Sequence, residues 1–93
     1  MVKKAKKLKV ELVRNRINVS ITRTTYFFDV IAEGEISDLK LLKKKLKLDT
    51  MVIEKGIFGK PMIVLDTCDD FSSAKHLMRD YIWKINTEIK EWK

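Results

Sequence analysis

Residues 60–92 constrain the fold more than any other stretch, because a short strand pattern passes there directly into a long helix pattern. Pro61 precedes an apolar, β-branched run at residues 62–65, which is typical of a strand. Residues 66–73 supply turn and cap side chains, and from Phe71 onward apolar residues recur every three or four positions. A strand followed by an amphipathic helix needs a sheet to cover, so we expect the rest of the chain to provide that sheet.

Strand patterns also fill the first third of the chain. Residues 8–12 and 17–21 alternate apolar with polar side chains, as half-buried strands do, and residues 26–33 are aromatic and β-branched. Residues 14–16 offer a turn between the first two segments, and residues 22–25 offer another before the third. We therefore expect a meander of two or three antiparallel strands in this part of the chain.

A first helix is expected after Gly34, with Ser37 as its N-cap and an apolar stripe that faces the sheet, formed by Ile36, Leu39, Leu42 and Leu46. Residues 50–54 and 60–67 are expected to be strands, joined by a hairpin in which two glycines allow positive φ. The element order is then (β)ββαββα. We predict an α+β fold, in which an antiparallel sheet of three to five strands carries both helices on one face.

The chain has 93 residues, 45% of them hydrophobic, and these values fit one globular domain. We expect residues 1–7 to be a basic flexible arm and residues 8–93 to form a single α+β domain. No apolar run reaches membrane-spanning length and no apolar signal region follows the basic start, so we expect a cytoplasmic protein. Cys68 and His76 are each the only residue of their kind, which excludes an intramolecular disulfide and the commonest zinc sites.

The net charge of +7 originates at the N-terminal end, where residues 1–25 carry eight Lys or Arg and one Glu. A run of lysines can bind phosphate through counterion release, which requires no fixed geometry. The candidate nucleic-acid-binding residues are therefore the lysines of the first segment, namely Lys3, Lys4, Lys6, Lys7 and Lys9. The alternative is a solvated tail that aids solubility.

Trp83 interrupts the pattern of the second helix, because it falls about 160° from the centre of the apolar stripe. His76, Arg79 and Lys90 lie near it on the predicted outer face, and Leu41 of the first helix also points outward. Tryptophan and arginine are enriched at binding hot spots, so these five residues are expected to bind a partner. The alternative is that Trp83 packs on neighbouring aliphatic stems or under a loop.

Asp66, Asp69 and Asp70 surround Cys68, a combination that can bind hard cations or support a nucleophile. Their spacing fits neither a calcium loop nor a cysteine-protease signature, and acids before a helix cap its free N–H groups. We expect no catalytic residue, no metal site and no cofactor, so the chain is not expected to be an enzyme.

Residues 26–92 resemble the CTAG/Pcc family, which contains the small dimerisation subunit of the KEOPS complex. The resemblance lies in a strand, an Asp, a Ser-containing helix start with a basic residue and an aromatic helix, which are here Ile63-Val64-Leu65, Asp70, Ser72-Ser73-Ala74-Lys75 and Tyr81-Ile82 with Ile85. The family usually has Arg in place of Lys75 and Asn in place of Arg79, and residues 8–23 have no clear counterpart. These departures fit a divergent paralogue.

The resemblance implies a non-catalytic assembly subunit of a KEOPS-like complex, which makes threonylcarbamoyl-adenosine in tRNA. Such a subunit pairs with an identical or paralogous small subunit through a sheet edge, and its helices dock on a kinase-like catalytic subunit. Covering an open strand edge would satisfy its free backbone groups in any case. The alternative function is a free-standing basic nucleic-acid-binding protein or a small inhibitor of a host machine.

Overall fold

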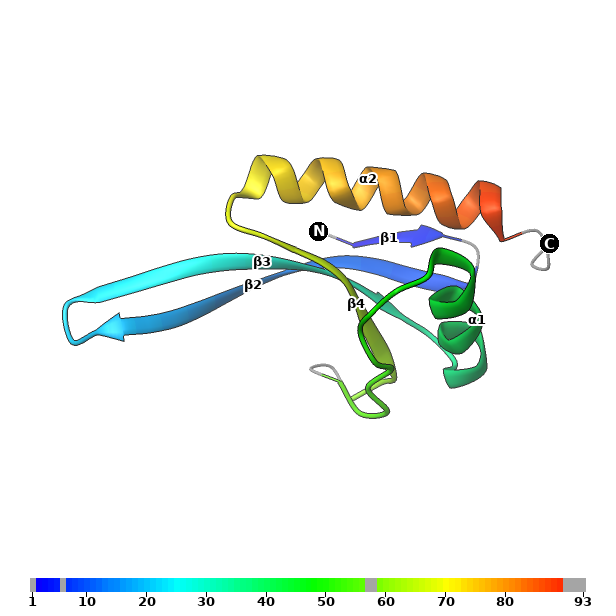
Figure 1. The fold of residues 1–93 in the computed structure, drawn as a ribbon, viewed down its shortest axis with the longest axis horizontal. Helices are drawn as coiled ribbons and strands as arrows, with labels where there is room; N and C mark the ends of the chain where they lie inside the picture. Colours follow the sequence, from blue (N-terminus) through cyan, green and yellow to red (C-terminus); the bar gives the residue numbers. More distant parts are fainter. Residues whose placement is uncertain (1, 6, 57–58, 90–93) are drawn as a thin grey trace.

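An antiparallel sheet with two helices forms the protein, and its elements follow one another as β1, β2, β3, α1, β4 and α2 in the computed structural model (Figure 1). The structure describes residues 2–5, 7–56 and 59–89, with the backbone alone for residues 2–5 and 17–19. The elements are β1 (Val2–Ala5), β2 (Leu8–Ser20), β3 (Arg23–Glu33), α1 (Ile36–Leu46), β4 (Met62–Cys68) and α2 (Phe71–Glu88). The four strands lie in chain order, so the sheet is a meander. The predicted α+β class with two helices on an antiparallel sheet is confirmed.

Both helices bury their apolar stripes on the same face of the sheet, where they form one core. Leu39 and Leu42 of α1 and Met78 and Ile85 of α2 are fully or almost fully buried, as the helical spacing predicts. The strands contribute alternate residues to this core, namely Leu8, Val10, Val30, Ala32, Ile63 and Leu65. A β-bulge shifts the register between Val30 and Ile31, and Leu65, the extra residue of β4 at this bulge, also belongs to the core.

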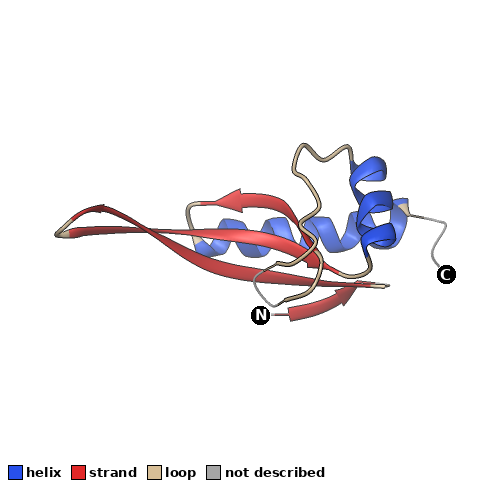
Figure 2. Cartoon of the chain, turned by 90° about the horizontal axis from the view of Figure 1, so that it is seen from below, coloured by secondary structure: helices blue, strands red, loops and turns tan. Residues whose placement is uncertain are grey.

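The opposite face of the sheet is covered by the segment between α1 and β4, which crosses the underside of the sheet (Figure 2). Ile31 and Met62 are buried there, although both point away from the helices. Gly56 approaches this face so closely that a Cβ at its position would collide with the Met62 side chain. The connection thus supplies a second, smaller apolar layer.

Two predicted strands at residues 8–12 and 17–21 are in fact one long strand, β2, so the expected turn at residues 14–16 is wrong. Asn15 pairs with Phe27 of β3, and its amide donates a 2.6 Å hydrogen bond to the Asp29 carboxylate. The alternation changes phase near this point, which resembles a break between two strands. The physical reason is that the hairpin leaves the core here, so neither face has to be apolar. The turn lies instead at Ile21 and Thr22.

The expected flexible arm is also corrected, because β1 pairs antiparallel with β2, from Val2 opposite Glu11 to Ala5 opposite Leu8. Strand pairing uses backbone N–H and C=O groups, and lysines are well tolerated on an edge strand. A Lys-rich sequence therefore does not prevent strand formation when a neighbouring strand offers a free edge. The domain includes β1 as well as the residues that follow it.

The strand expected at residues 50–54 is reduced to a single bridge between Ile53 and Met62. The backbone N–H of each residue donates to the carbonyl of the other at 2.8 and 2.9 Å, and the Thr50 hydroxyl donates to the Val64 carbonyl at 2.6 Å. A tight turn follows at once, since Gly56 N–H bonds the Lys60 carbonyl. The segment turns before it can form further pairs with β4. The element order is therefore βββαβα and not the predicted (β)ββαββα.

Helix α2 begins with a side-chain N-cap, whereas helix α1 does not. Asp70 is the N-cap of α2, and its carboxylate accepts a 3.0 Å hydrogen bond from the Ser73 N–H. This bond holds the pKa of Asp70 below its usual value. The N-cap of α1 is Glu35 rather than the predicted Ser37, and it makes no side-chain cap bond. Helix α1 ends at Lys47, whose φ of 54° is left-handed.

Candidate interaction surfaces

The outer face of α2 carries three of the five residues predicted to bind a partner. His76, Arg79 and Trp83 are all exposed, and the exposed fraction of Trp83 is 64%, which is large for an indole. Ser72, Lys75, His76 and Arg79 line a shallow hollow of about 110 Å³ on the same face. The helix register predicted for Trp83 is therefore correct, and this face combines an apolar residue with basic neighbours.

The remaining two residues do not extend that surface. Leu41 is partly buried and packs against the core. The prediction that Leu41 points outward is wrong for this reason. Lys90 lies outside the described residues. The apolar part of the outer α2 surface therefore consists of Trp83.

The predicted nucleic-acid-binding lysines do not form one mobile cluster. Lys3 and Lys4 belong to β1, where they pair with Val10 and Lys9 of β2. Lys6 lies outside the described residues, and Lys7 and Lys9 are exposed. The backbone of Lys3 and Lys4 is therefore held in the sheet, and these two lysines do not belong to a flexible arm.

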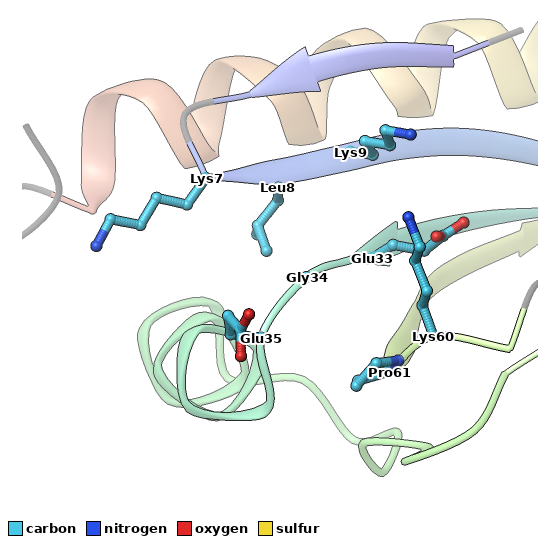
Figure 3. A pocket seen from close by; sticks show the side chains of 8 residues that line it. All are labelled: Lys7, Leu8, Lys9, Glu33, Gly34, Glu35, Lys60 and Pro61. Carbon is cyan, nitrogen blue, oxygen red and sulfur yellow. The ribbon is translucent and has the colours of Figure 1, made fainter.

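Lys7 and Lys9 line a pocket of about 470 Å³ at the end of the sheet (Figure 3). Acidic residues also line it, since Glu33 and Glu35 lie beside the lysines. Leu8 points toward Gly34, where a Cβ would come within 2.5 Å of the leucine side chain. The mixed charges of this pocket do not resemble a phosphate site, which would gather positive charge.

Two carboxyl groups are buried together on the sheet face opposite the helices. Glu11 and Glu33 are 8% and 6% exposed, so both side chains are buried on this face. Burial and, next, the contact with Glu33 raise the pKa of Glu11. One carboxyl oxygen of Glu33, Oε1, is buried without a hydrogen-bond partner in the part of the chain that the structure describes. This pair is a site of electrostatic strain in the fold.

Two of the three aspartates around Cys68, Asp66 and Asp70, have structural roles. Asp70 caps α2, while the Asp66 carboxylate accepts from the Thr67 N–H at 2.8 Å and from the Tyr81 hydroxyl at 3.4 Å. Burial, assisted by the Asp66 charge, raises the pKa of Tyr81. Cys68 is partly buried in β4 opposite Phe28. Over residues 2–5, 7–56 and 59–89 no group of three or more His, Cys, Asp or Glu side chains is arranged to hold a metal ion.

The β2–β3 hairpin is the surface that sequence reasoning missed. It extends well beyond the N-terminal end of α2 and gives the molecule a long axis of 49 Å, against 26 and 22 Å for the other axes (Figures 1 and 2). Arg14, Arg16 and Arg23 are exposed on it, and the Arg14 guanidinium lies over the Tyr26 ring, 5.2 Å from its centroid. The basic and polar composition of residues 14–25 could have indicated this surface, but residues 14–16 and 22–25 were interpreted as turns.

No protein-family model, curated protein or solved structure matches this chain.

None of the helices that the structure describes has the length and apolar character needed to span a membrane.

Proposed function

We propose that this protein is a non-catalytic assembly subunit that accepts a strand from a partner at its sheet edge and presents the outer face of α2 to another. The observation that carries the proposal is that β2 and β3 pair with each other along the hairpin, while much of the outer edge of each strand has no partner strand. Within the described residues, β1 pairs only with residues 8–11 of β2, and β4 pairs only with residues 28–33 of β3. Residues 12–20 of β2 and residues 25–27 of β3 therefore have an outer edge that no further described strand pairs with.

Open edges of this length favour strand addition. Each new backbone hydrogen bond contributes about 0.5–1.5 kcal/mol, so a five-residue pairing contributes roughly 5 kcal/mol. Association also costs translational and rotational freedom, so backbone pairing alone gives only weak binding. Val13 and Phe27, both half-buried beside these edges, supply apolar area that a partner strand would cover. Backbone pairing and side-chain burial together support a micromolar association.

Trp83 supplies the second contact. An exposed indole with Arg79 one turn away has the composition of an interface centre, and truncation of such a residue typically costs about 2 kcal/mol or more. The two surfaces belong to different elements, the hairpin and α2, which suits a subunit that bridges two different partners.

The resemblance to the CTAG/Pcc family gives this proposal its most specific form. Over the resembling region the chain alternates strand, helix, strand and helix through β3, α1, β4 and α2, although a single bridge replaces one family strand. In this form the protein is a cytoplasmic subunit of a KEOPS-like complex that makes threonylcarbamoyl-adenosine in tRNA. The sheet edge meets an identical or paralogous small subunit, and α2 meets the kinase-like catalytic subunit.

Sedimentation velocity of the purified protein tests the proposal, alone and mixed with a candidate paralogue and the kinase-like subunit. We expect a dimer or a heterodimer, and a larger species when the kinase-like subunit is added. A variant in which Asn-Gly replaces residues 16–26 keeps the Asn15–Phe27 pair next to a two-residue turn and removes most of the open edge. It should stay folded and lose the small-subunit contact, while Trp83→Ala should lose the kinase-like contact. A wild-type protein that stays monomeric in every mixture would refute the proposal.

A further inference from the structure

The hairpin carries a concentration of positive charge that differs from the N-terminal lysines. Residues 12–28 contain three arginines and neither Asp nor Glu. Arg14, Arg16 and Arg23 are all exposed, and the hairpin that carries them extends beyond the N-terminal end of α2 (Figure 1). With no acidic side chain in this segment, the local field attracts an anionic partner.

The side chains that bear this charge lie in an ordered arrangement. Arg14 pairs with Phe28 and Arg16 with Tyr26, so these four residues share the sheet face on which α2 lies. Arg14, Arg16 and Tyr26 line a hollow of about 410 Å³. Tyr26 is 47% exposed, which leaves part of its ring open beside the Arg14 guanidinium. Arginine next to an accessible aromatic ring matches both the phosphates and the bases of nucleic acid.

This surface continues toward α2 through aromatic contacts. Phe28 packs on Phe71 with the ring centroids 5.6 Å apart, and the Lys75 amino group lies 5.5 Å from the centroid of Phe71. Asp69 and Asp70 limit the positive surface at the start of the helix, because both are exposed there. The basic and aromatic surface is thus confined to the hairpin and the first turns of α2.

The tip of the hairpin is apolar. Ile21 forms the turn with Thr22, and it is the most exposed large hydrophobic residue in the described chain. A large aliphatic side chain has no stabilising role in an isolated turn, where Gly, Asn and Asp are favoured. Proteins that bind nucleic acid with a projecting element often insert such a residue between base steps.

We propose that the β2–β3 hairpin is a nucleic-acid-binding ribbon, in which Arg14, Arg16 and Arg23 contact backbone phosphates and Ile21 inserts between bases. A two-stranded ribbon is narrow enough to enter a groove of a duplex, and its residues 12–20 span about 30 Å, roughly one helical turn of DNA. The charges also argue against a second copy of the protein on this face, since two copies would place arginines opposite arginines. Arg14 and Arg16 lie on the sheet face that carries α2, whereas strand alternation places Arg23 near the tip on the opposite face. These side chains bind from the faces of the hairpin, so the binding is independent of strand addition at its backbone edges.

Fluorescence anisotropy with labelled duplex DNA, duplex RNA and stem-loop RNA, over 50–300 mM salt, tests this inference. The triple variant Arg14→Gln, Arg16→Gln and Arg23→Gln should flatten the slope of log affinity against log salt by about 2–3, which is the effect of three lost phosphate contacts. Comparison of the three probes identifies the type of nucleic acid.

The matched control is the triple variant Lys40→Gln, Lys44→Gln and Lys55→Gln, which removes the same charge from exposed positions away from the hairpin. It should leave the slope within about one of the wild-type value. Equal loss in both variants, or no binding of any probe by the wild type, would overturn the inference. A variant that lacks residues 1–5 and loses the whole salt dependence would do the same, because the lysines would then carry the binding.

Insertion of the tip has a readout of its own. A probe that contains 2-aminopurine should brighten when Ile21 unstacks a base step, and Ile21→Ser should abolish that change while the salt slope stays the same. Ile21 is fully exposed, so this variant should fold like the wild type, which circular dichroism can check. If the Ile21→Ser variant gave the same fluorescence change as the wild type, the proposed insertion of Ile21 would be wrong.

Discussion

Two isoleucines on α2 provide a direct test of the helix packing. Ile85 is fully buried in the core, whereas Ile82, three residues earlier, is only partly buried at its border. Both side chains lie in the same helix, so substitution by Ala changes intrinsic helix propensity equally. Any difference between Ile85→Ala and Ile82→Ala therefore reports on tertiary packing alone.

The size of that difference follows from burial. Replacing Ile by Ala removes three carbon atoms, which is worth about 2.4 kcal/mol of transfer free energy at a fully buried site. The cavity that remains adds a further cost, so Ile85→Ala should lower the free energy of unfolding by about 3–5 kcal/mol. Ile82 already meets water and leaves a smaller cavity, so Ile82→Ala should cost about 1–2 kcal/mol. Sequence periodicity alone gives both residues the same cost.

Urea unfolding followed by circular dichroism measures the difference at a fixed protein concentration. With a slope of about 1.5 kcal/mol per molar, Ile85→Ala should lower the midpoint by about 2–3 M and Ile82→Ala by about 1 M. Equal shifts, or a larger shift for Ile82→Ala, would refute the packing described for α2. A change in the slope itself would indicate altered compactness or loss of two-state unfolding, and a calorimetric measurement would then be needed for the comparison.

Three further outcomes test other parts of the structure. Trp83→Ala should change stability by no more than about 0.5 kcal/mol, and a large fall in melting temperature would place Trp83 in the core. The raised pKa of Glu11 means that its stabilising contribution is complete below the usual glutamate value of 4.5 and is lost as pH rises through the higher folded-state pKa. Glu11→Gln should therefore melt above the wild type at pH 7, with the gap closing toward pH 4, and a gap that is independent of pH would contradict the Glu33 contact. Deletion of residues 1–5 removes β1 and should cost about 1–2 kcal/mol, whereas unchanged melting would restore the flexible-arm interpretation.

Local patterns specified the elements that meet the core. The helical stripe predicted burial of Met78 and Ile85, and the acid before the helix predicted the Asp70 cap, because both depend on spacing of a few residues. Ile82 lies on the same apolar stripe but is only partly buried, because it lies at the border of the core, and Phe28 of β3 is likewise only partly buried. Periodicity gives the direction of a side chain, and it does not give the distance to the edge of the neighbouring layer.

The candidate site divides in the same way. The outward direction of Trp83 follows from helix geometry, so the sequence was sufficient to predict it. Leu41 could not be placed from its own helix, because its partial burial depends on how α1 packs against the core. Arg14 and Arg16 were assigned to a turn, since nothing local shows that a polar segment continues as a strand once it has left the core.

The sequence by itself therefore determined the α+β class, the two helices and the residues that face the sheet, since each of these follows from interactions within one element. Tertiary structure decided which strands pair and over how many residues. It made a strand of Val2–Ala5 by offering it the free edge of β2, reduced residues 50–54 to one bridge, and extended β2 and β3 beyond the core. The physical reason is that backbone hydrogen bonds carry no sequence code, so pairing depends on which edge lies nearby when the helices cover the sheet.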